Sequence, residues 1–228
     1  MTLGRTCTAA MLSSFTLIGA YKVKNELNHA KKIITTILRD KTSSLEQFRK
    51  ATDRVASILA HEVMNNMQIQ EVTIETPLTS MPGAKFDRPV ILVPVIRSGI
   101  PLLKTFLNQF EHARVGFVGL ARDEETAQAH WYYEKIPQIK NDEYVIILEP
   151  MLATGGTALE VLRKLKSNGA QEKNIFFVSI VCAPEGIKAI KTEFPQIAIV
   201  TTAIDTHLND KKFIVPGLGD FGDRYFGT

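Results

Sequence analysis

Cysteine is scarce in this 228-residue sequence, and Cys7 and Cys182 form neither a CxxC pair nor a metal-binding spacing. A disulfide-stapled fold is therefore excluded, and a reducing compartment, the cytoplasm, is the expected location. Histidine supplies no ligand set either, because its five copies follow no HxxxH or comparable spacing. We expect no protein-bound zinc site.

Long apolar runs and charge of one sign are also lacking. No apolar segment reaches the roughly 18 residues that a membrane-spanning helix needs, since the nearest candidate, 9–20, contains Ser13, Ser14 and Thr16. The net charge is only +3, from 27 basic and 24 acidic residues, and no block of like charge occurs. We therefore expect neither a membrane nor a nucleic acid as a partner.

The first 24 residues are interpreted as an N-terminal extension of unknown role. They hold no acidic residue, and Arg5, Lys22 and Lys24 lie among several serines and threonines. Transit peptides share this composition with extensions that have no targeting role, and Met11 is an alternative translation start. No repeat, low-complexity tract or long linker divides the remainder, so we expect a single domain at 25–228.

Short apolar runs alternate with amphipathic segments along this domain. The apolar runs predict strands at 90–95, 115–120, 145–148, 175–181 and 197–200. The amphipathic segments predict helices at 101–110, 157–167 and 184–194. An earlier helix is indicated from Thr42, with Ser43 and Glu46 as its capping box, and a Pro-containing stretch at 77–89 follows it. This alternation predicts an α/β fold with a mostly parallel sheet covered on both faces, and ligands at the carboxyl ends of its strands.

The segment 145–157 carries the most specific chemical signal. A buried strand delivers one carboxylate, Glu149, to the sheet edge, and Ala-Thr-Gly-Gly-Thr at 153–157 then opens a helix. The amides, hydroxyls and helix dipole of this turn suit a phosphate, and its glycines let the backbone approach closely. The segment is not a P-loop, because GxxxxGK[ST] is absent. An ordinary β–α turn capped by threonines is the alternative.

This arrangement resembles the phosphoribosyl-diphosphate motif of the type I phosphoribosyltransferases. The version Glu-Pro-Met-Leu-Ala-Thr-Gly-Gly, with Pro150 in place of a second acid, is similar to the uracil phosphoribosyltransferase family. Val-Pro-Val-Ile-Arg-Ser-Gly at 93–99 resembles the pyrophosphate loop of that family, and Gly-Leu-Ala-Arg-Asp-Glu-Glu-Thr at 119–126 resembles its mobile loop. The final segment, 214–228, resembles its uracil-binding segment, and the similarity begins near Asn25.

The resemblance implies a phosphoribosyltransferase type I fold with a small projecting arm or hood, and it implies the site residues. The catalytic residues would be Arg97, Arg122, Glu149 and Asp220. The same four would bind phosphoribosyl diphosphate together with a turn made of Pro150, Met151, Leu152, Ala153, Thr154, Gly155, Gly156 and Thr157. Main-chain atoms of Ile214, Gly219 and Phe221 would bind uracil, with Asp220 near both substrates.

The implied reaction transfers ribose-5-phosphate from phosphoribosyl diphosphate to uracil, giving UMP and diphosphate in pyrimidine salvage. The implied cofactor is Mg²⁺, held mainly by substrate oxygens and water, a role that suits a site with few protein carboxylates. The resemblance further implies a homodimer or homotetramer, with GTP as a candidate effector. The aromatic residues at 131–133 would lie on the projecting arm as a dimer contact, the alternatives being a core patch or a base-stacking surface.

Three residues depart from the family pattern. Glu149 stands where uracil enzymes usually carry Asp, and Phe213 stands where Tyr is common. Phe221 replaces the Ala of many bacterial members, so we expect a bulkier wall of the base pocket. Cys182 lies in an apolar strand and is expected to be a buried, inert thiol.

Three rival interpretations are weaker. Gly217, Gly219 and Gly222 spell GxGxxG, but only six residues follow, so the helix of a dinucleotide site has no room. An RNA-binding pyrimidine-operon regulator on the same fold would keep a two-acid motif and a basic face, which Pro150 and the small net charge argue against. A purine phosphoribosyltransferase is disfavoured by Pro150 and by the Gly-Leu-Gly-Asp-Phe-Gly-Asp near the end.

Overall fold

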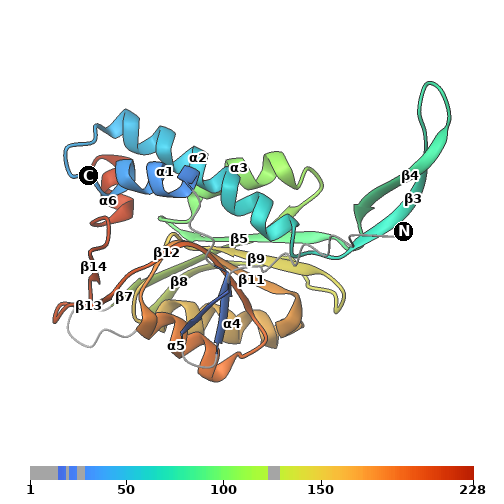
Figure 1. Cartoon of the computed structure of the whole chain (residues 1–228). Coiled ribbons are helices and arrows are strands. Elements are labelled where there is room, and N and C mark those ends of the chain that lie inside the picture. Colours follow the sequence, from blue (N-terminus) through green and yellow to red (C-terminus); the bar gives the residue numbers. More distant parts are fainter. Residues whose placement is uncertain (1–14, 19–20, 25–28, 123–128) are drawn as a thin grey trace, which may run out of the picture.

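The computed structural model describes residues 15–18, 21–24, 29–122 and 129–228 (Figure 1). Its main sheet is built from β1 (Phe15–Ile18), β2 (Tyr21–Lys24), β5 (Val90–Ile96), β6 (Arg114–Val115), β7 (Phe117–Arg122), β8 (Ala129–Lys135), β9 (Tyr144–Leu148), β10 (Met151–Leu152), β11 (Ile175–Cys182) and β12 (Ala198–Ile204). The order is β1-β2-β12-β11-β9-β5-β7-β8, with β6 beside β5 and β10 beside β11. Strands β12, β11, β9 and β5 run parallel, so their carboxyl ends meet at one edge of the sheet.

Helices cover both faces of the sheet (Figure 1). They are α1 (His29–Arg39), α2 (Leu45–Met64), α3 (Ile100–Gln109), α4 (Gly156–Ser167), α5 (Pro184–Glu193) and α6 (Phe221–Phe226). Helices α1, α2, α3 and α6 lie on one face, and α4 and α5 lie on the other. Each face of the sheet has its own hydrophobic core. Along β5, Leu92 packs into the core beneath α1, α2, α3 and α6, while Ile91 and Val93 pack into the core beneath α4 and α5, because successive side chains of a strand point to opposite faces. The predicted α/β fold with a mostly parallel sheet is confirmed.

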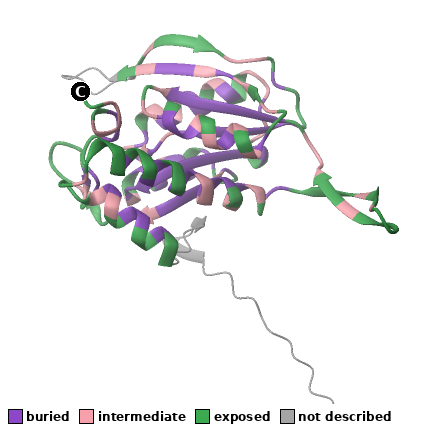
Figure 2. Cartoon of the chain, turned by 90° about the horizontal axis from the view of Figure 1, so that it is seen from above, coloured by how far each residue is buried: buried purple, intermediate pink, exposed green. Residues whose placement is uncertain are grey.

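A hairpin projects from the body of the molecule (Figures 1 and 2). It pairs β3 (Ile69–Glu75) antiparallel with β4 (Ser80–Phe86), and most of its residues are exposed. A projecting arm is therefore present, but its placement at 131–133 was wrong. Those residues belong to β8, which pairs with β7 in the main sheet, and Trp131 packs against the core. The hairpin escaped prediction because strands exposed on both faces show no alternation of apolar and polar residues.

The first turn of α2 differs by one residue from the predicted capping box. Ser44 is the N-cap residue, and its hydroxyl accepts a hydrogen bond from the Gln47 N–H at 3.2 Å. The Gln47 side chain in turn accepts from the Ser44 N–H at 2.8 Å. The box predicted at Ser43 and Glu46 is thus wrong, because the Ser43 hydroxyl donates to a carbonyl of α1 instead.

Other element boundaries agree unevenly with the sequence prediction. The three helices predicted after residue 100 are confirmed to within one residue at each end. Helix α1 is not among the predicted helices, and β12 continues to Ile204, beyond its predicted end at residue 200. Part of the segment 1–24 lies in the sheet, where β2 pairs with β12 through Lys24 and Val200. No helix in the described part of the chain has the length and apolarity to cross a membrane.

Candidate active site

Three segments meet at the carboxyl edge of the parallel strands. The turn at 97–99 follows β5, and Glu149 follows the neighbouring strand β9. The C-terminal segment reaches the same place, because Asp223 Oδ1 of α6 lies 3.5 Å from Arg97 Nη2. Asp220 is close enough for its charge to act on Glu149. The fold therefore brings Arg97, Glu149 and Asp220 together, as the sequence predicted.

A buried glycine sets the distance between the first two segments. A Cβ atom on Gly99 would lie only 2.1 Å from the Leu148 carbonyl oxygen, so only glycine lets this turn pack against the end of β9. The close approach brings Ser98 to Glu149, and the Ser98 hydroxyl donates to Glu149 Oε1 at 2.9 Å. Ser98 is a site residue that had not been singled out.

Glu149 is half-buried, and its environment favours the protonated form. The pKa of Glu149 is raised from its ordinary 4.5 to about 7, chiefly by burial and to a lesser extent by the negative charge of Asp220. Hydrogen bonds from the Ser98 hydroxyl and the Met151 backbone act in the opposite direction. A carboxyl poised near neutral pH, next to a second acid, is typical of a site that receives a cationic or metal-bound ligand.

Arg97 projects from the turn after β5 and remains accessible. Its side chain is 57% exposed, and the peptide bond that precedes it is cis. Its guanidinium lies 3.5 Å from the exposed Asp223 carboxylate and 5.7 Å from the centre of the Phe226 ring. Because an exposed pair at this distance contributes little free energy, Arg97 is free to exchange Asp223 for an anionic ligand.

The turn after Glu149 is built by backbone bonds and glycines. The Pro150 carbonyl accepts from the Ile180 N–H at 2.9 Å, and Met151 and Leu152 pair with β11 as strand β10. The chain then passes Ala153 and Thr154 and reaches Gly155, which has a φ of 88°. Glycine adopts this left-handed conformation without strain, so α4 can begin at Gly156 with its first N–H groups directed at the turn. Thr157, in the first turn of α4, is half-buried.

The predicted base-binding segment surrounds a tight turn near the C-terminus. Ile214 lies in β14 (Ile214–Val215), which pairs antiparallel with β13 (His207–Leu208). Gly219 is exposed and has a φ of 82°. Asp220 is the N-cap residue of α6, and its side chain accepts from the Asp223 N–H at 2.9 Å. Asp220 thus lies near Glu149, and the helix that it caps reaches Arg97 through Asp223.

The side chain of Phe221 does not form the expected pocket wall. It is 1% exposed and packs in the core, with its ring centre 5.5 Å from that of Phe48 in α2. The bulk that distinguishes Phe221 from alanine therefore fills the space between α6 and α2. Phe213 is 55% exposed.

One predicted site residue lies outside what the structure describes. Arg122 is the last residue of β7, and its side chain and the following residues, 123–128, lie outside the described part. The role predicted for Arg122 stays a prediction.

Three residues that sequence reasoning missed hold the C-terminal segment in place. They are Arg39, at the end of α1, Asp205, directly after β12, and Arg224, in α6. Asp205 had a readable signal, since it follows a buried strand as Glu149 does. The signal was lost because β12 was predicted to end at residue 200. Neither arginine has a local signal, because most of their partners are remote in the sequence.

The rest of the described chain offers no strong alternative as a metal site or a nucleophile. No group of three His, Cys, Asp or Glu residues in the described ranges could hold a metal ion. Cys182 is fully buried, as predicted, and burial raises the pKa of its thiol to about 12. Such a thiol is almost entirely protonated near pH 7 and is a poor nucleophile.

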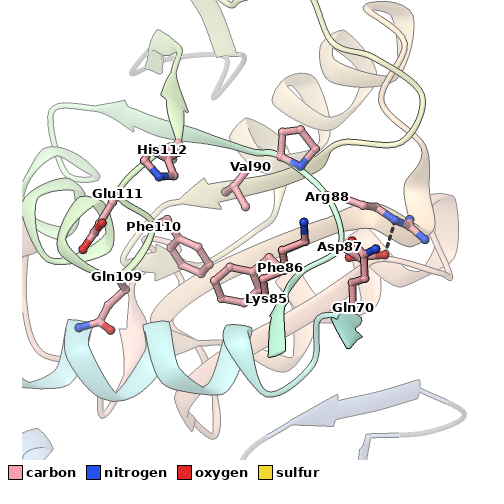
Figure 3. Close-up of a pocket in the computed structure, with 12 residues that line it drawn as sticks. Gln70, Lys85, Phe86, Asp87, Arg88, Val90, Gln109, Phe110, Glu111 and His112 are labelled. Atoms are coloured by element: carbon pink, nitrogen blue, oxygen red, sulfur yellow. Dashed lines mark hydrogen bonds and ion pairs between the residues drawn. The ribbon is translucent and has the colours of Figure 1, made fainter. Parts of the chain in front are cut away.

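A separate cavity of about 530 Å³ lies at the base of the arm (Figure 3). Phe86, Val90 and Phe110 line it, beside Arg88, which bonds Asp87 at 2.9 Å. Val90 begins β5, whereas the turn with Arg97 follows its other end. The cavity is therefore at the opposite edge of the sheet, and none of the predicted site residues lines it.

Comparisons with known proteins agree with this geometry. The family model for uracil phosphoribosyltransferase matches residues 27–228. The uracil phosphoribosyltransferase of Limosilactobacillus reuteri (strain DSM 20016) is 39% identical over 194 residues, which cover 85% of this chain and 92% of that protein. The uracil phosphoribosyltransferase of Levilactobacillus brevis is 43% identical over 194 residues, which again cover 85% of this chain and 92% of that protein.

Solved structures extend the comparison to the fold. The AQ2163 protein from Aquifex aeolicus superposes with a TM-score of 0.81 at 34% identity, covering 89% of this chain and 97% of that one. Adenine phosphoribosyl transferase from Trypanosoma brucei shares the fold alone, with a TM-score of 0.58 at 11% identity, over 88% of this chain and 90% of that one. The fold is that of the phosphoribosyltransferases. Within that class, the chain belongs to the uracil phosphoribosyltransferase family.

Proposed function

We propose that this protein is a glycosyltransferase of pyrimidine salvage. It transfers the ribose-5-phosphate unit of 5-phospho-α-D-ribose 1-diphosphate to N1 of uracil and releases UMP and diphosphate. Family membership supports the activity. The observation that carries it to particular residues is the carboxylate of Glu149 at the end of β9, followed after β10 by a glycine turn at the N-terminus of α4.

The turn and the helix behind it are the anchor for the 5′-phosphate. Ala153 to Thr157 supply backbone N–H groups and two hydroxyls, and the N-terminus of α4 adds its positive dipole end. Pro150, Met151 and Leu152 hold the turn against β11. An anchored phosphate fixes the sugar, which places its C1′ atom between the diphosphate and base sites.

Charge placement drives the proposed reaction. The bond between C1′ and the diphosphate oxygen breaks, and the oxygen keeps the electron pair. Uracil N1 bonds to C1′ and loses its proton, which passes to the released diphosphate or to water. Glu149, bound to the ribose 2′- and 3′-hydroxyls, supplies negative charge near the cationic sugar ring. Arg97 and Arg122 neutralise the leaving diphosphate. Most of the catalysis is then positioning and electrostatics, without a covalent intermediate.

Mg²⁺ is the proposed cofactor, bound through oxygens of the diphosphate and water. The fit rests on the donors present: Glu149 and Asp220 are hard oxygen ligands close enough to interact. Two or fewer protein carboxylates are typical for a Mg²⁺ that arrives with a phosphorylated substrate. When bound, the ion neutralises diphosphate charge. Asp220 and Glu149 would be the protein carboxylates available to accept hydrogen bonds from water molecules bound to such an ion.

One assay tests the proposed function. The protein is incubated with phosphoribosyl diphosphate, Mg²⁺ and one of five bases: uracil, cytosine, adenine, guanine or hypoxanthine. UMP from uracil is the expected product. A purine nucleotide as the main product would point to the purine alternative. The absence of any nucleotide, together with tight RNA binding at physiological salt, would point to the regulator.

Gel filtration with and without GTP tests the expected dimer or tetramer and the candidate effector.

Glu149→Gln is expected to lower kcat by about 10-fold to 10²-fold, the loss typical of one charged hydrogen-bond partner. The amide still bonds a ribose hydroxyl, but it no longer supplies the charge that favours the cationic transition state over the ground state. The dissociation constant of phosphoribosyl diphosphate should therefore change less than the single-turnover rate. Equal losses in both quantities would reduce Glu149 to a simple binding group.

Stability should fall with rising pH because of Glu149. Its pKa is about 7 in the folded protein and ordinarily 4.5, so between these values the folded protein holds a proton that the unfolded chain has released. The contribution of this carboxyl to the free energy of unfolding is therefore full below about pH 4.5 and is lost as the pH rises through about 7. Urea unfolding of the parent and of Glu149→Gln, each measured from pH 4.5 to 8, should diverge across that window. Parallel curves would contradict the burial of this group.

A further inference from the structure

A buried carboxylate holds the turn between the two halves of the base-binding segment. Asp205, whose side chain is 3% exposed, stands at the carboxyl end of β12. Both of its oxygens accept from the Arg39 guanidinium, at 2.8 Å for Oδ2 and 2.5 Å for Oδ1. Oδ2 also accepts from the Gly217 N–H at 2.8 Å. Arg39 then donates to the Gly217 carbonyl at 2.6 Å, so both polar groups of Gly217 are bound by this pair.

A second arginine extends the same arrangement by one residue. Arg224 Nη1 donates to the Leu218 carbonyl at 2.7 Å and to the Leu38 carbonyl. Its Nη2 donates to the Asp40 carbonyl at 2.6 Å. The two successive carbonyls of Gly217 and Leu218 are thus held by two guanidinium groups, and both are tied to the end of α1. We refer to Arg39, Asp205 and Arg224 as the clamp.

The clamped residue is also the point at which the segment reverses. Gly217 has a φ of 61°, and a Cβ atom there would lie 2.2 Å from the Ile214 carbonyl oxygen. Ile214 and Gly219 are therefore fixed relative to each other through Gly217. Because the clamp occupies backbone groups of residues 217 and 218, it leaves Gly219 exposed toward the site. The direction of the base-binding atoms then depends on side chains that do not themselves touch the base.

We propose that Arg39, Asp205 and Arg224 are positioning residues for base recognition, an inference that rests on the proposed function of this site. By holding the Gly217 N–H and the carbonyls of Gly217 and Leu218, which lie between Ile214 and Gly219, they fix the spacing of an acceptor and the donors that read one edge of uracil. Phosphoribosyl diphosphate is bound mainly by other loops, 97–99 and 149–157, and Asp220 is the one residue that it shares with the clamped segment. Loss of the clamp therefore weakens uracil binding more than it weakens the binding of phosphoribosyl diphosphate.

The chain offers a matched control for this proposal. Glu143 is also 3% exposed, and its carboxylate also accepts from one arginine, Arg114, at 2.7 and 2.6 Å. It also accepts one backbone N–H, that of Lys140, at 2.8 Å. Glu143 directly precedes β9, at the sheet edge opposite the active site. Asp205→Asn and Glu143→Gln thus make the same chemical change in two equally buried carboxylates.

The experiment compares these two variants with the parent by two measurements. Hydrogen exchange needs no substrate: in Asp205→Asn, the amides of residues 213–224 should exchange about 10-fold faster or more, while those of 150–160 stay as in the parent. Steady-state kinetics should show that the KM for uracil rises about 10-fold or more in Asp205→Asn, with a clearly smaller change in the affinity for phosphoribosyl diphosphate. Glu143→Gln should change neither quantity.

Two results would overturn the proposal. Unchanged exchange at 213–224 in Asp205→Asn would show that the clamp does not hold the segment. Equal losses for uracil and for phosphoribosyl diphosphate, or the same losses in Glu143→Gln, would reduce it to a general stabilising pair. If the parent makes no UMP from uracil, the proposed function fails, whereas the exchange measurement still decides whether the clamp exists.

A second pair of variants guards against misfolding of Asp205→Asn. The Arg39 side chain is 24% exposed, so substitution there is better tolerated. Arg39→Lys keeps the positive charge but loses the bidentate hydrogen bond to Asp205. Arg39→Met loses the charge and the hydrogen bond. The KM for uracil should rise in the order parent, Arg39→Lys, Arg39→Met, with a clearly smaller change in the affinity for phosphoribosyl diphosphate. An identical KM in all three would contradict a positioning role.

Discussion

Arg97→Ala is expected to lower kcat by about 10²-fold to 10³-fold while the protein stays folded, the effect typical of removing one preorganised donor from developing charge. Its guanidinium is 57% exposed and has only a 3.5 Å contact with Asp223 and a ring contact with Phe226. Neither contact is buried enough to contribute much to stability. The side chain is therefore free to bind the diphosphate, whose charge grows as the bond to C1′ breaks.

The measurement is kcat with saturating substrates, alongside the free energy of unfolding in urea. Arg163→Ala is the control, because Arg163 is also half-exposed and also paired with acids, Glu160 and Glu193, and it lies beyond the first turn of α4, away from the phosphate turn. In Arg163→Ala, the activation free energy derived from kcat and the free energy of unfolding should each change by no more than about 0.5 kcal/mol, as for an ordinary surface substitution. Activity of Arg97→Ala within threefold of the parent would remove Arg97 from the mechanism.

The residues nearest the reaction could be found from the sequence because their signals are local. Each follows or precedes a buried strand within a few positions, as Arg97 and Glu149 do. A run such as that of β9 is apolar at every position because both faces of the sheet are covered, so its end is easy to locate. An acid or an arginine that directly follows such a strand can therefore be assigned from the sequence to the carboxyl ends of the strands, where ligands bind.

The parts that could not be predicted depend on contacts between distant residues. The arm β3–β4 has no buried face and thus no period, and the buried face of α1 is half polar, since Lys31 and Thr35 lie there beside Ile34 and Leu38. Arg39 meets Gly217 only after the whole sheet has formed between them. Phe221 was predicted to make the wall of the base pocket bulkier, but its ring packs in the core against Phe48, far away in α2.

The clamp and the Phe221 packing together define what the base can touch. Gly219 is exposed in a left-handed conformation, and the ring of the neighbouring Phe221 is withdrawn into the core. If residues 219–221 receive the base as proposed, the surface they offer is backbone together with the exposed side chain of Asp220. Backbone groups distinguish bases by the order of donors and acceptors and are indifferent to small apolar substituents.

Cytosine is therefore expected to be rejected by about 10²-fold to 10⁴-fold in kcat/KM relative to uracil. Uracil presents acceptor, donor and acceptor at O2, N3–H and O4, whereas cytosine inverts the last two. Each mismatch leaves a buried polar group unpaired, at a cost of about 1–3 kcal/mol. If the Ile214 carbonyl and the 219–221 backbone read this edge, both penalties apply.

A competition assay with uracil, 5-fluorouracil and cytosine tests this reading. 5-Fluorouracil keeps all three polar groups, and the buried Phe221 ring does not narrow the site, so its turnover should be comparable to that of uracil. Asp205→Asn supplies an internal check, because a misplaced segment should lower the discrimination against cytosine together with the affinity for uracil. Comparable turnover of cytosine by the parent would mean that the base is not read by this segment, and the assignment of uracil as substrate would fall with it.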